Sequence, residues 1–461
     1  MVKNFPVGPG SAQRPLFQLP KPPSARLLGL TLVTLAASLT ACEGGSPESP
    51  AAAADAGEAP GTPAQAGAPT GGPMEGLPAA GKWRGSLMLP GGGLTFGIDF
   101  EEEDAGLRAI LLNGEERRAA GIVEETESGV VIPLPPYQSR LVATLEGGGE
   151  ALVGRWQRDK GEGWVDELPF AAIAGAEPLE LGAVPGAAVA AMSGRWSVDF
   201  AKDDEDAVGL FSIDSLGRAR GTFLTTLGDY RYLAGYSSGT ELLLGCFDGA
   251  HAFLFTATMQ ENGGLKGEFW SRGSYHDTWT AVKDSEASLP DDFALTAWVG
   301  GVPLSELTFP DEDGEAHALD DPAFAADARL LVVFGTWCPN CNDLTEYLVQ
   351  LDEQYEGLGI VGLAFEMGDD PKKHAQAVRD YRAHHGAQYP ILIGGTADKA
   401  EASKAFPLID QVRAYPTTVF MDREGNVSAV HTGFSGPATE DAHATLKTRF
   451  ESEIESLLAA D

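Results

Sequence analysis

The sequence predicts a multi-domain chain in which two β-rich modules, small barrels or sandwiches, precede an α/β domain. Three observations predict this architecture: short alternating segments between Gly-rich turns, an approximate internal repeat, and alternating apolar strands and helices after about Pro303. A length of 461 residues also suits about two to four domains. We place the boundaries at 1–41, 42–80, 81–176, 190–284 and 300–461.

Residues 1–41 predict a lipoprotein signal peptide and not a folded element. A basic lead without acidic residues precedes the apolar run LLGLTLVTLAASLTAC, which is too short to remain across a bilayer. The end of this run resembles the lipobox of bacterial lipoproteins, which implies cleavage before Cys42 and a lipid anchor on that cysteine. A plain secretory signal with a chance cysteine is the alternative. Both interpretations predict an exported protein.

Residues 42–80 predict a tether between the lipid bilayer and the folded part. They are almost wholly Ala, Gly, Pro, Ser, Thr and Glu, a composition that cannot bury a core. The whole chain is acidic, with 67 Asp and Glu against 32 Lys and Arg. Because this negative charge repels the phosphate backbone of nucleic acids, we expect no nucleic-acid partner.

The two β-rich modules, 81–176 and 190–284, read as copies of one another. Each opens with a Gly-x-Trp and ends in a Gly-rich strand with a tryptophan: Trp83 and Trp156 in the first, Trp196 and Trp270 in the second. An Asn-Gly turn at Asn113 predicts a hairpin. Polar and aromatic residues of the second module suggest a surface that grips a client; these are Asp229, Tyr230, Arg231, Asp248 and His251. An aromatic core with ordinary turns is the alternative.

Residues 300–461 predict an α/β layer around a central sheet. The run RLLVVFG is continuous and apolar, as expected of a buried parallel strand. Leu344, Leu348, Leu351 and Tyr355 fall on one face of the helix that follows. A later helix has Pro371 in its first turn. Further strands and helices alternate to the end of the chain.

Of the four cysteines, two stand together in VVFGTWCPNCNDL, and this pair carries the functional prediction. Cys246 lies in an apolar strand and is expected to be an inert buried thiol. Cys338 and Cys341 lack a second pair to complete a zinc site, and their loop is too short for an effective structural staple. A copper site with His431 as third ligand is an alternative.

Redox exchange suits the pair best. Cys338 would lie at a helix N-terminus, where unpaired N–H groups and the helix dipole favour the thiolate and make it the nucleophile. Cys341, one turn further in and more buried, would resolve the mixed disulfide. We expect no metal and no cofactor besides the redox-active Cys338–Cys341 disulfide.

FGTWCPNC, followed by AYPTTVFMDREG, resembles the thioredoxin fold. With the lipoprotein leader, the chain is most similar to TlpA/ResA-like thiol–disulfide oxidoreductases. The resemblance implies a cis Pro416 against the cysteines and a substrate surface formed by Trp337, Tyr415 and Pro416. It also implies that Glu366 takes the proton from Cys341, although a surface glutamate at a strand end is the alternative.

The sequence departs from ordinary thioredoxins at two positions. Val332 stands where thioredoxins have an aspartate, and Asn342 stands where they have a lysine. Thr336 is two residues before Cys338, one position away from the peroxiredoxin pattern, so peroxide reduction is disfavoured.

The predicted protein is an exported, membrane-anchored thiol–disulfide oxidoreductase on the periplasmic face of the envelope, held to the inner or outer membrane through acylated Cys42. Its expected partners are periplasmic protein disulfides, such as those of apocytochrome c, and a membrane electron donor. One alternative is an envelope scaffold lipoprotein whose β modules bind a partner. Others are a thiol peroxidase and a copper-handling protein of the same fold.

Overall fold

The structure, a computed structural model, describes residues 76–159, 165–175, 186–202 and 206–459. The predicted signal peptide, Cys42 and nearly all of the tether lie outside the described residues. In the described part of the chain, none of the helices combines the length and the apolar character needed to cross a membrane.

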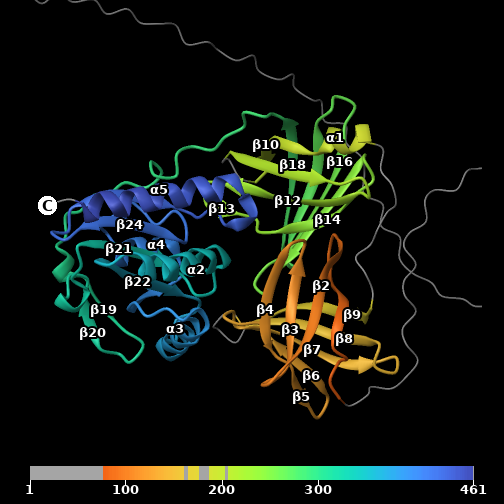
Figure 1. Cartoon of the computed structure of the whole chain (residues 1–461), viewed down its shortest axis with the longest axis horizontal. Helices are drawn as coiled ribbons and strands as arrows, with labels where there is room; N and C mark the ends of the chain where they lie inside the picture. The colour runs from red at the N-terminus through yellow and green to blue at the C-terminus, as the bar shows by residue number, and fades with distance from the viewer. Residues whose placement is uncertain (1–75, 160–164, 176–185, 203–205, 460–461) are drawn as a thin grey trace, which may run out of the picture. The chain divides into compact units, whose positions relative to one another are not determined.

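The first β-rich module is a nine-stranded antiparallel sheet with the order β4-β3-β2-β1-β9-β8-β7-β6-β5, drawn in orange in Figure 1. Buried and exposed side chains alternate along its strands, because successive residues of a strand point to opposite faces. The predicted Asn-Gly turn joins β3 to β4. The strands are β1 (Gly81–Leu89), β2 (Gly92–Glu103), β3 (Gly106–Asn113), β4 (Glu116–Ile122), β5 (Glu124–Thr126), β6 (Gly129–Pro133), β7 (Ser139–Glu146), β8 (Ala151–Asp159) and β9 (Val165–Ala174).

The second module follows a short helix, α1 (Gly186–Met192), and has the strand order β11-β10-β18-β17-β16-β15-β14-β12-β13. An additional pairing of β11 with β12 closes this sheet into a barrel. Its strands are β10 (Gly194–Phe200), β11 (Ala207–Ile213), β12 (Arg218–Thr225), β13 (Gly228–Asp229), β14 (Leu233–Ser237), β15 (Glu241–Phe247), β16 (Ala252–Met259), β17 (Leu265–Ser271) and β18 (Tyr275–Lys283). Cys246 is buried in β15, as predicted.

The repeat seen in the sequence matches the strand pairing but not the packing of all four tryptophans. In both modules the first strand pairs with the last, β1 with β9 and β10 with β18. Trp83, Trp156 and Trp196 are buried in the cores of their own modules. Trp270, on β17, is only partly buried and packs against the core of the first module.

The first module's core also takes in residues of the second. Phe247, Ala252 and Leu254, from β15 and β16, are buried within it, and the rings of Phe96 and Phe247 lie 4.7 Å apart. The two modules therefore bury apolar surface jointly, which favours their staying together.

The C-terminal α/β domain has a five-stranded sheet with the order β23-β22-β21-β24-β25. A two-stranded hairpin, β19–β20, precedes it in the chain. β21 pairs parallel with β22 and antiparallel with β24, and every residue of β21 is buried, as its apolar run predicted. The elements are β19 (Thr308–Pro310), β20 (Ala316–Ala318), β21 (Ala328–Phe334), α2 (Pro339–Gln354), β22 (Leu358–Glu366), α3 (Pro371–His385), β23 (Ile391–Thr396), α4 (Lys399–Ala405), β24 (Thr417–Asp422), β25 (Val427–Thr432) and α5 (Asp441–Leu458).

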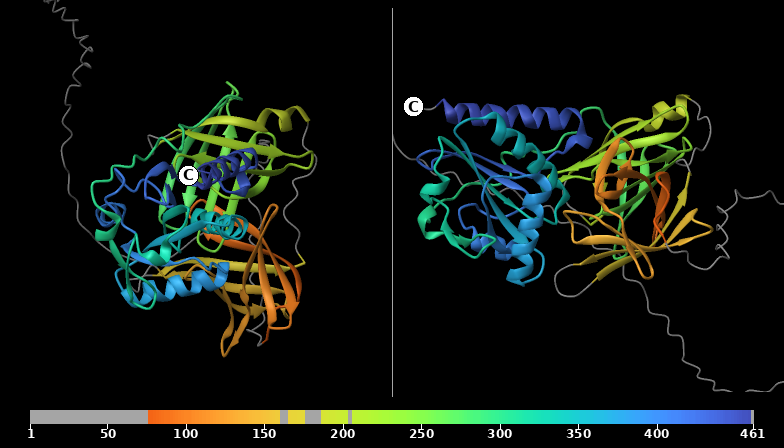
Figure 2. Two further views of the ribbon diagram at one scale, coloured as in Figure 1. Left: turned by 60° about the vertical axis from the view of Figure 1, so that its left-hand side comes forward. Right: turned by 60° about the horizontal axis from the view of Figure 1, so that its bottom comes forward.

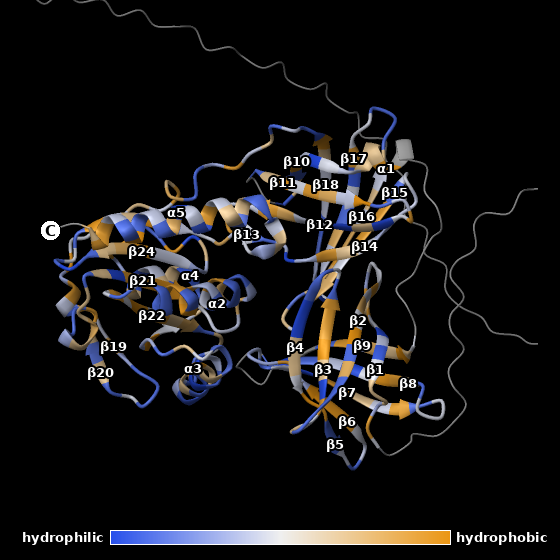
Figure 3. Ribbon diagram, in the orientation of Figure 1, coloured by the Kyte–Doolittle hydropathy of each residue, from blue (hydrophilic) through white to orange (hydrophobic). Residues whose placement is uncertain are grey.

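Helices cover both faces of this sheet. α3 and α5 lie on opposite sides of it (Figures 1 and 2). α2 packs beside α5, where the Tyr347 hydroxyl donates hydrogen bonds to the Lys447 carbonyl and to Glu451. Hydrophobic and hydrophilic residues alternate along α5 (Figure 3), as expected of a helix with one face on a core.

Local sequence explains where the helices begin and end. Pro371 is the first residue of α3, Asp370 caps it by accepting from the Lys372 N–H, and Gly386 ends it at a φ of 66°. In α2 the leucines of the predicted apolar face are buried, while Tyr355 is the C-cap residue.

Candidate redox site

The two cysteines lie where the central strand β21 gives way to helix α2. Cys338 is the N-cap residue of α2, and its carbonyl accepts a hydrogen bond from the Asn342 N–H. Cys341 lies in the first turn of the helix. Both are free thiols, with exposed fractions of 8 % for Cys338 and 1 % for Cys341. The deeper position of Cys341 agrees with the sequence-based expectation.

The surroundings drive the pKa values of the two thiols apart. Burial alone would raise the pKa of Cys338, but hydrogen bonds from the Cys341 thiol and the backbone N–H groups of Cys341 and Asn340 lower it. The positive charge of Arg231 acts in the same direction. Burial and the neighbouring Cys338 sulfur raise the pKa of Cys341 well above its usual value. At neutral pH Cys338 is therefore the better nucleophile.

Glu366 is the last residue of β22 and faces the start of α2. Its carboxylate accepts hydrogen bonds from the Thr336 N–H at 2.9 Å and the Thr336 hydroxyl at 2.7 Å. Only 3 % of the residue is exposed, so the alternative of a surface glutamate is wrong. Burial raises the pKa of Glu366 to about 7, although both hydrogen bonds act against the rise. The charge of Glu366 in turn contributes to the raised pKa of Cys341.

Trp337, Tyr415 and Pro416 gather around Cys338. The Cys338 Sγ donates a hydrogen bond to the Tyr415 carbonyl at 3.4 Å, and the Tyr415–Pro416 peptide bond is cis, as the resemblance implied. The indole of Trp337 meets the Tyr415 ring edge-on at 5.6 Å and donates to the Phe365 carbonyl at 2.9 Å. All three expected substrate-binding residues are therefore neighbours of the nucleophile.

Helix α3 contributes residues that the sequence did not single out for this site. The Asn342 amide donates to the Cys338 carbonyl at 2.8 Å, while its oxygen pairs with His385 Nε2 at 2.7 Å. The Tyr381 hydroxyl donates to the Cys341 carbonyl at 3.1 Å. His385 lies on a helix separate from the cysteines in the sequence, and only packing of α3 on α2 brings it to the motif.

The second β module also reaches the motif, and this corrects the expected client surface. Asp229, Arg231 and Asp248 are buried, not displayed on a free surface. The carbonyl of Asp229 accepts from the Asn340 amide at 3.5 Å, and its carboxylate accepts from the Gly436 N–H at 2.6 Å. No sequence signal indicated this burial, because charged turn residues usually face solvent.

Arg231 is the centre of a buried ion cluster that joins three parts of the chain. Its guanidinium pairs with Asp343 on α2, with Glu116 on β4 at 2.8 Å, and with Asp248, which follows β15, at 3.6 Å. From the first module, Arg158 Nη2 donates to the Trp337 carbonyl at 3.2 Å.

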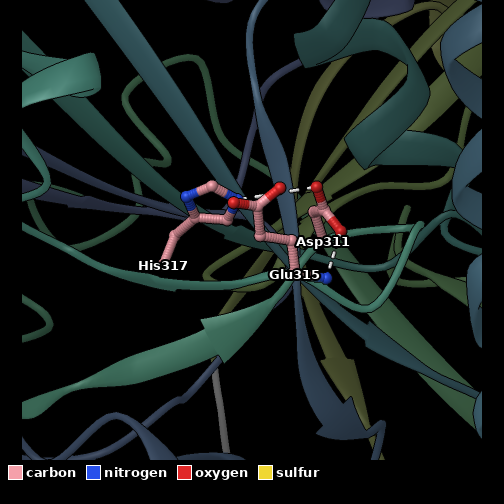
Figure 4. A group of neighbouring side chains, drawn as sticks. All are labelled: Asp311, Glu315 and His317. Carbon is pink, nitrogen blue, oxygen red and sulfur yellow. Dashed lines mark hydrogen bonds and ion pairs between the residues drawn. The ribbon is translucent and has the colours of Figure 1, made fainter.

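The expected copper ligand is not at the cysteines. His431 Nε2 pairs with Asp292 at 3.0 Å. Among the described residues, the group with metal-ligand geometry is Asp311, Glu315 and His317 at the β19–β20 hairpin (Figure 4). Glu315 is exposed, and His317 pairs with Asp321 at 3.2 Å as well as with Asp311 at 3.5 Å.

The comparisons with known proteins concern the C-terminal domain. The Redoxin family model matches residues 299–446. Thiol-disulfide oxidoreductase ResA of Geobacillus thermodenitrificans is 28 % identical over 138 residues, 30 % of this chain and 72 % of that protein. The thioredoxin-like protein YneN of Bacillus subtilis is 27 % identical over 122 residues, 26 % of this chain and 64 % of that protein.

Solved structures align with the same share of the chain. A secreted disulfide oxidoreductase of Mycobacterium tuberculosis, homologous to DsbE of E. coli, covers 31 % of this chain and 94 % of its own, at 16 % identity and a TM-score of 0.24. A thiol-disulfide oxidoreductase of Bacteroides fragilis covers 30 % and 95 %, at 18 % identity and a TM-score of 0.23.

The family match, the ResA relatives and the paired thiols at the start of α2 agree with one another. The C-terminal domain of this chain is a thiol–disulfide oxidoreductase with the thioredoxin fold, and it is similar to the TlpA/ResA-like proteins.

Proposed function

We propose that this protein is an exported, membrane-anchored oxidoreductase that reduces disulfides of client proteins in the bacterial envelope through Cys338 and Cys341. The observation that carries the proposal is the difference between the two thiols. Cys338 has a lowered pKa and the greater exposure, whereas Cys341 is buried and has a raised pKa. This asymmetry suits one cysteine to attack and the other to resolve.

The reaction follows from that arrangement. The Cys338 thiolate attacks one sulfur of the client disulfide, and the other client sulfur leaves as a thiolate that takes a proton from water. Cys341 then loses its proton to Glu366 and attacks the Cys338 sulfur of the mixed disulfide. The second client thiol is released, and the Cys338–Cys341 disulfide holds the two-electron oxidation. A membrane-bound dithiol must reduce this disulfide before the next cycle.

The location of the reaction is proposed from the leader. The apolar run and Cys42 support export and acylation, and acyl chains would hold the tether to the inner or outer membrane. Clients would then be exported proteins with a disulfide to be reduced, apocytochrome c among them. Pro339 and Asn340 separate the cysteines and belong to the first turn of α2, where they influence the stability of the dithiol.

The equilibrium reduction potential of the Cys338–Cys341 couple tests the direction of exchange. The full chain in detergent would be equilibrated with glutathione or dithiothreitol buffers, and the two thiols would be counted by alkylation and mass spectrometry. We expect a value near or below about −250 mV, as for a reductant. A value near about −120 mV would make the protein an oxidant of its clients. Absence of any two-electron couple would exclude the redox function.

A further inference from the structure

The 226–231 turn of the second β module lies directly on the redox motif. This turn connects β12 to β14 and contains the short strand β13. Asp229 accepts hydrogen bonds from Asn340, which stands between the two cysteines, and from Gly436, which follows β25. One residue of the turn thus binds two separate loops of the redox domain.

The two surfaces approach each other closely at Gly228 and Gly433. A Cβ atom placed on Gly228 would lie 1.9 Å from the Asn340 Nδ2, far inside van der Waals contact. From the opposite side, a Cβ atom on Gly433 would lie 3.1 Å from the carbonyl carbon of Leu227. A side chain at either glycine would therefore require its neighbour to shift: the Asn340 amide at Gly228, and the Leu227 backbone, by less, at Gly433.

Arg231 fixes the end of the turn. Its backbone adopts a φ of 64°, which is uncommon for a residue with a side chain, and its N–H donates to the Asp229 carboxylate at 2.6 Å. Its guanidinium is 2 % exposed and pairs with Asp343, two residues after Cys341. Removing Arg231 from this cluster would leave buried carboxylates without their ion pair, so the cluster resists displacement of the arginine.

The first module closes another side of the site. Arg158 donates hydrogen bonds to the Trp337 carbonyl of the redox domain at 3.2 Å and to the Ala250 carbonyl of the second module at 2.7 Å. It therefore connects the first module to both other parts. The cavity beside Trp337 and Glu366, which Arg158 also lines, measures about 20 Å³, the space of roughly one water molecule. With the modules in these positions Cys338 is only 8 % exposed. Attack on a disulfide requires the Cys338 sulfur to lie in line with the client's S–S bond, so a client has to reach this largely buried sulfur.

We propose that the 226–231 turn is a specificity-determining part of the redox site: it occupies the surface beside Cys338, so that protein disulfides reach Cys338 only when the turn is displaced. The inference rests on the proposed function and adds a condition to it. Small disulfides need a smaller opening than a folded protein does. The rate with a protein client then scales with the fraction of molecules in which the turn has moved away.

Glycine substitutions on both sides of the contact test this proposal in the full chain. Gly228→Ala pushes the turn away from Asn340, and Gly433→Ala pushes on Leu227 from the redox domain. The matched controls are Gly263→Ala and Gly314→Ala, which also have positive φ angles, 82° and 85°, but open space around the added Cβ. The probes are insulin as a protein disulfide and dithiobis(nitrobenzoate) as a small one.

We expect both interface variants to reduce insulin on the order of tenfold faster than the wild-type chain, with a smaller gain for the small disulfide. The two controls should behave as wild type. Insulin rates at or below the wild-type rate in both interface variants would overturn the proposal. Lack of a redox couple in the wild-type chain would instead overturn the proposed function.

A second measurement needs no substitution at the interface. The Cys341→Ser variant stops the reaction at the mixed disulfide. Two adducts of this variant are prepared, one with a protein client and one with a small thiol bound to Cys338. Hydrogen exchange of the backbone amides in residues 226–231 is compared between the two adducts. We expect faster exchange in the protein adduct, because the client displaces the turn. Equal exchange in both adducts would contradict the proposal.

Discussion

The guanidinium of Arg231 and the carboxylate of Asp343 form a buried ion pair that joins the second β module to the helix carrying Cys341. Asp343 follows Cys341 by two residues, so this pair connects a β barrel to the first turns of the redox helix. The same guanidinium pairs with Glu116 of the first module. The Arg231 side chain therefore connects all three folded parts, and its positive charge lowers the pKa of Cys338.

Arg231→Met should destabilise the chain strongly. It removes the cation that pairs with the buried carboxylates of Glu116, Asp248 and Asp343, a loss of about 3–5 kcal/mol in the free energy of unfolding. Urea titration followed by tryptophan fluorescence measures it. The control is Arg220→Met, which removes an exposed pair with Glu115 and should cost less than about 1 kcal/mol. Equal losses in the two variants would contradict the importance of the cluster.

Arg231→Lys keeps the positive charge and should restore most of the stability. The charge of Arg231 helps to lower the pKa of Cys338. The lysine variant keeps this charge and changes the shape of the side chain, so it distinguishes the effect of charge from the effect of packing. We expect the Cys338 pKa to stay below its usual range in the lysine variant and to rise in the methionine variant. Thiolate absorbance at 240 nm against pH measures both. A Cys338 pKa that is the same in all three proteins would exclude this electrostatic role.

Cys338 should react with iodoacetamide at lower pH than the other described cysteines. Hydrogen bonds and charge lower its pKa below the usual thiol value despite burial, so a thiolate fraction persists as the pH falls. Burial raises the pKa of Cys341 and Cys246, which should stay unlabelled in the folded protein. Mass spectrometry of labelled peptides between pH 5 and 9 follows each site. Preferential labelling of Cys341 would reverse the assigned roles.

Glu366→Gln should slow the resolution of the mixed disulfide and leave its formation unchanged. A positioned general base contributes about 10²- to 10⁴-fold, and the glutamine cannot accept the proton of Cys341. Stopped-flow mixing with a small disulfide separates the two steps. The exposed Glu356→Gln is the matched control. If the attack step slows and the resolution step does not, Glu366 is not the base.

The pH dependence of resolution gives a further test of Glu366. Because burial raises the pKa of Glu366 to about 7, the carboxylate loses its base function as the pH falls through that value. We therefore expect the resolution rate in the wild-type chain to rise with pH around pH 7, and this rise to be absent in Glu366→Gln. A flat profile in the wild type would indicate that another group accepts the proton.

Much of the redox site was predictable because it is local in sequence. Cys338 and Cys341 stand three residues apart at the end of an apolar strand, and strand, turn and helix form from that stretch as the pattern indicates. The place of Glu366 and Tyr415 beside them followed from the resemblance to a known family. It did not follow from composition or spacing.

The contacts of the β modules with the redox motif were not predictable in this way. The 226–231 turn holds two charged residues, one glycine and one tyrosine, a composition that equally suits an exposed loop. Trp270 appears in the sequence as the counterpart of Trp156, yet it packs between the modules and not inside its own barrel. In both cases the burial depends on a partner distant in the sequence.

The sequence by itself determined the order of the β-rich and α/β parts, the close spacing of Cys338 and Cys341, and the strand and helix that present them, since these follow from short-range periodicity and capping. The tertiary structure decided which charged residues are buried. Glu366 is hydrogen-bonded to Thr336, Asp229 is hydrogen-bonded to Asn340, and Arg231 forms an ion pair with Asp343. The physical reason is that a charge becomes tolerable away from water only when a partner lies beside it, and in each case that partner comes from a distant part of the chain.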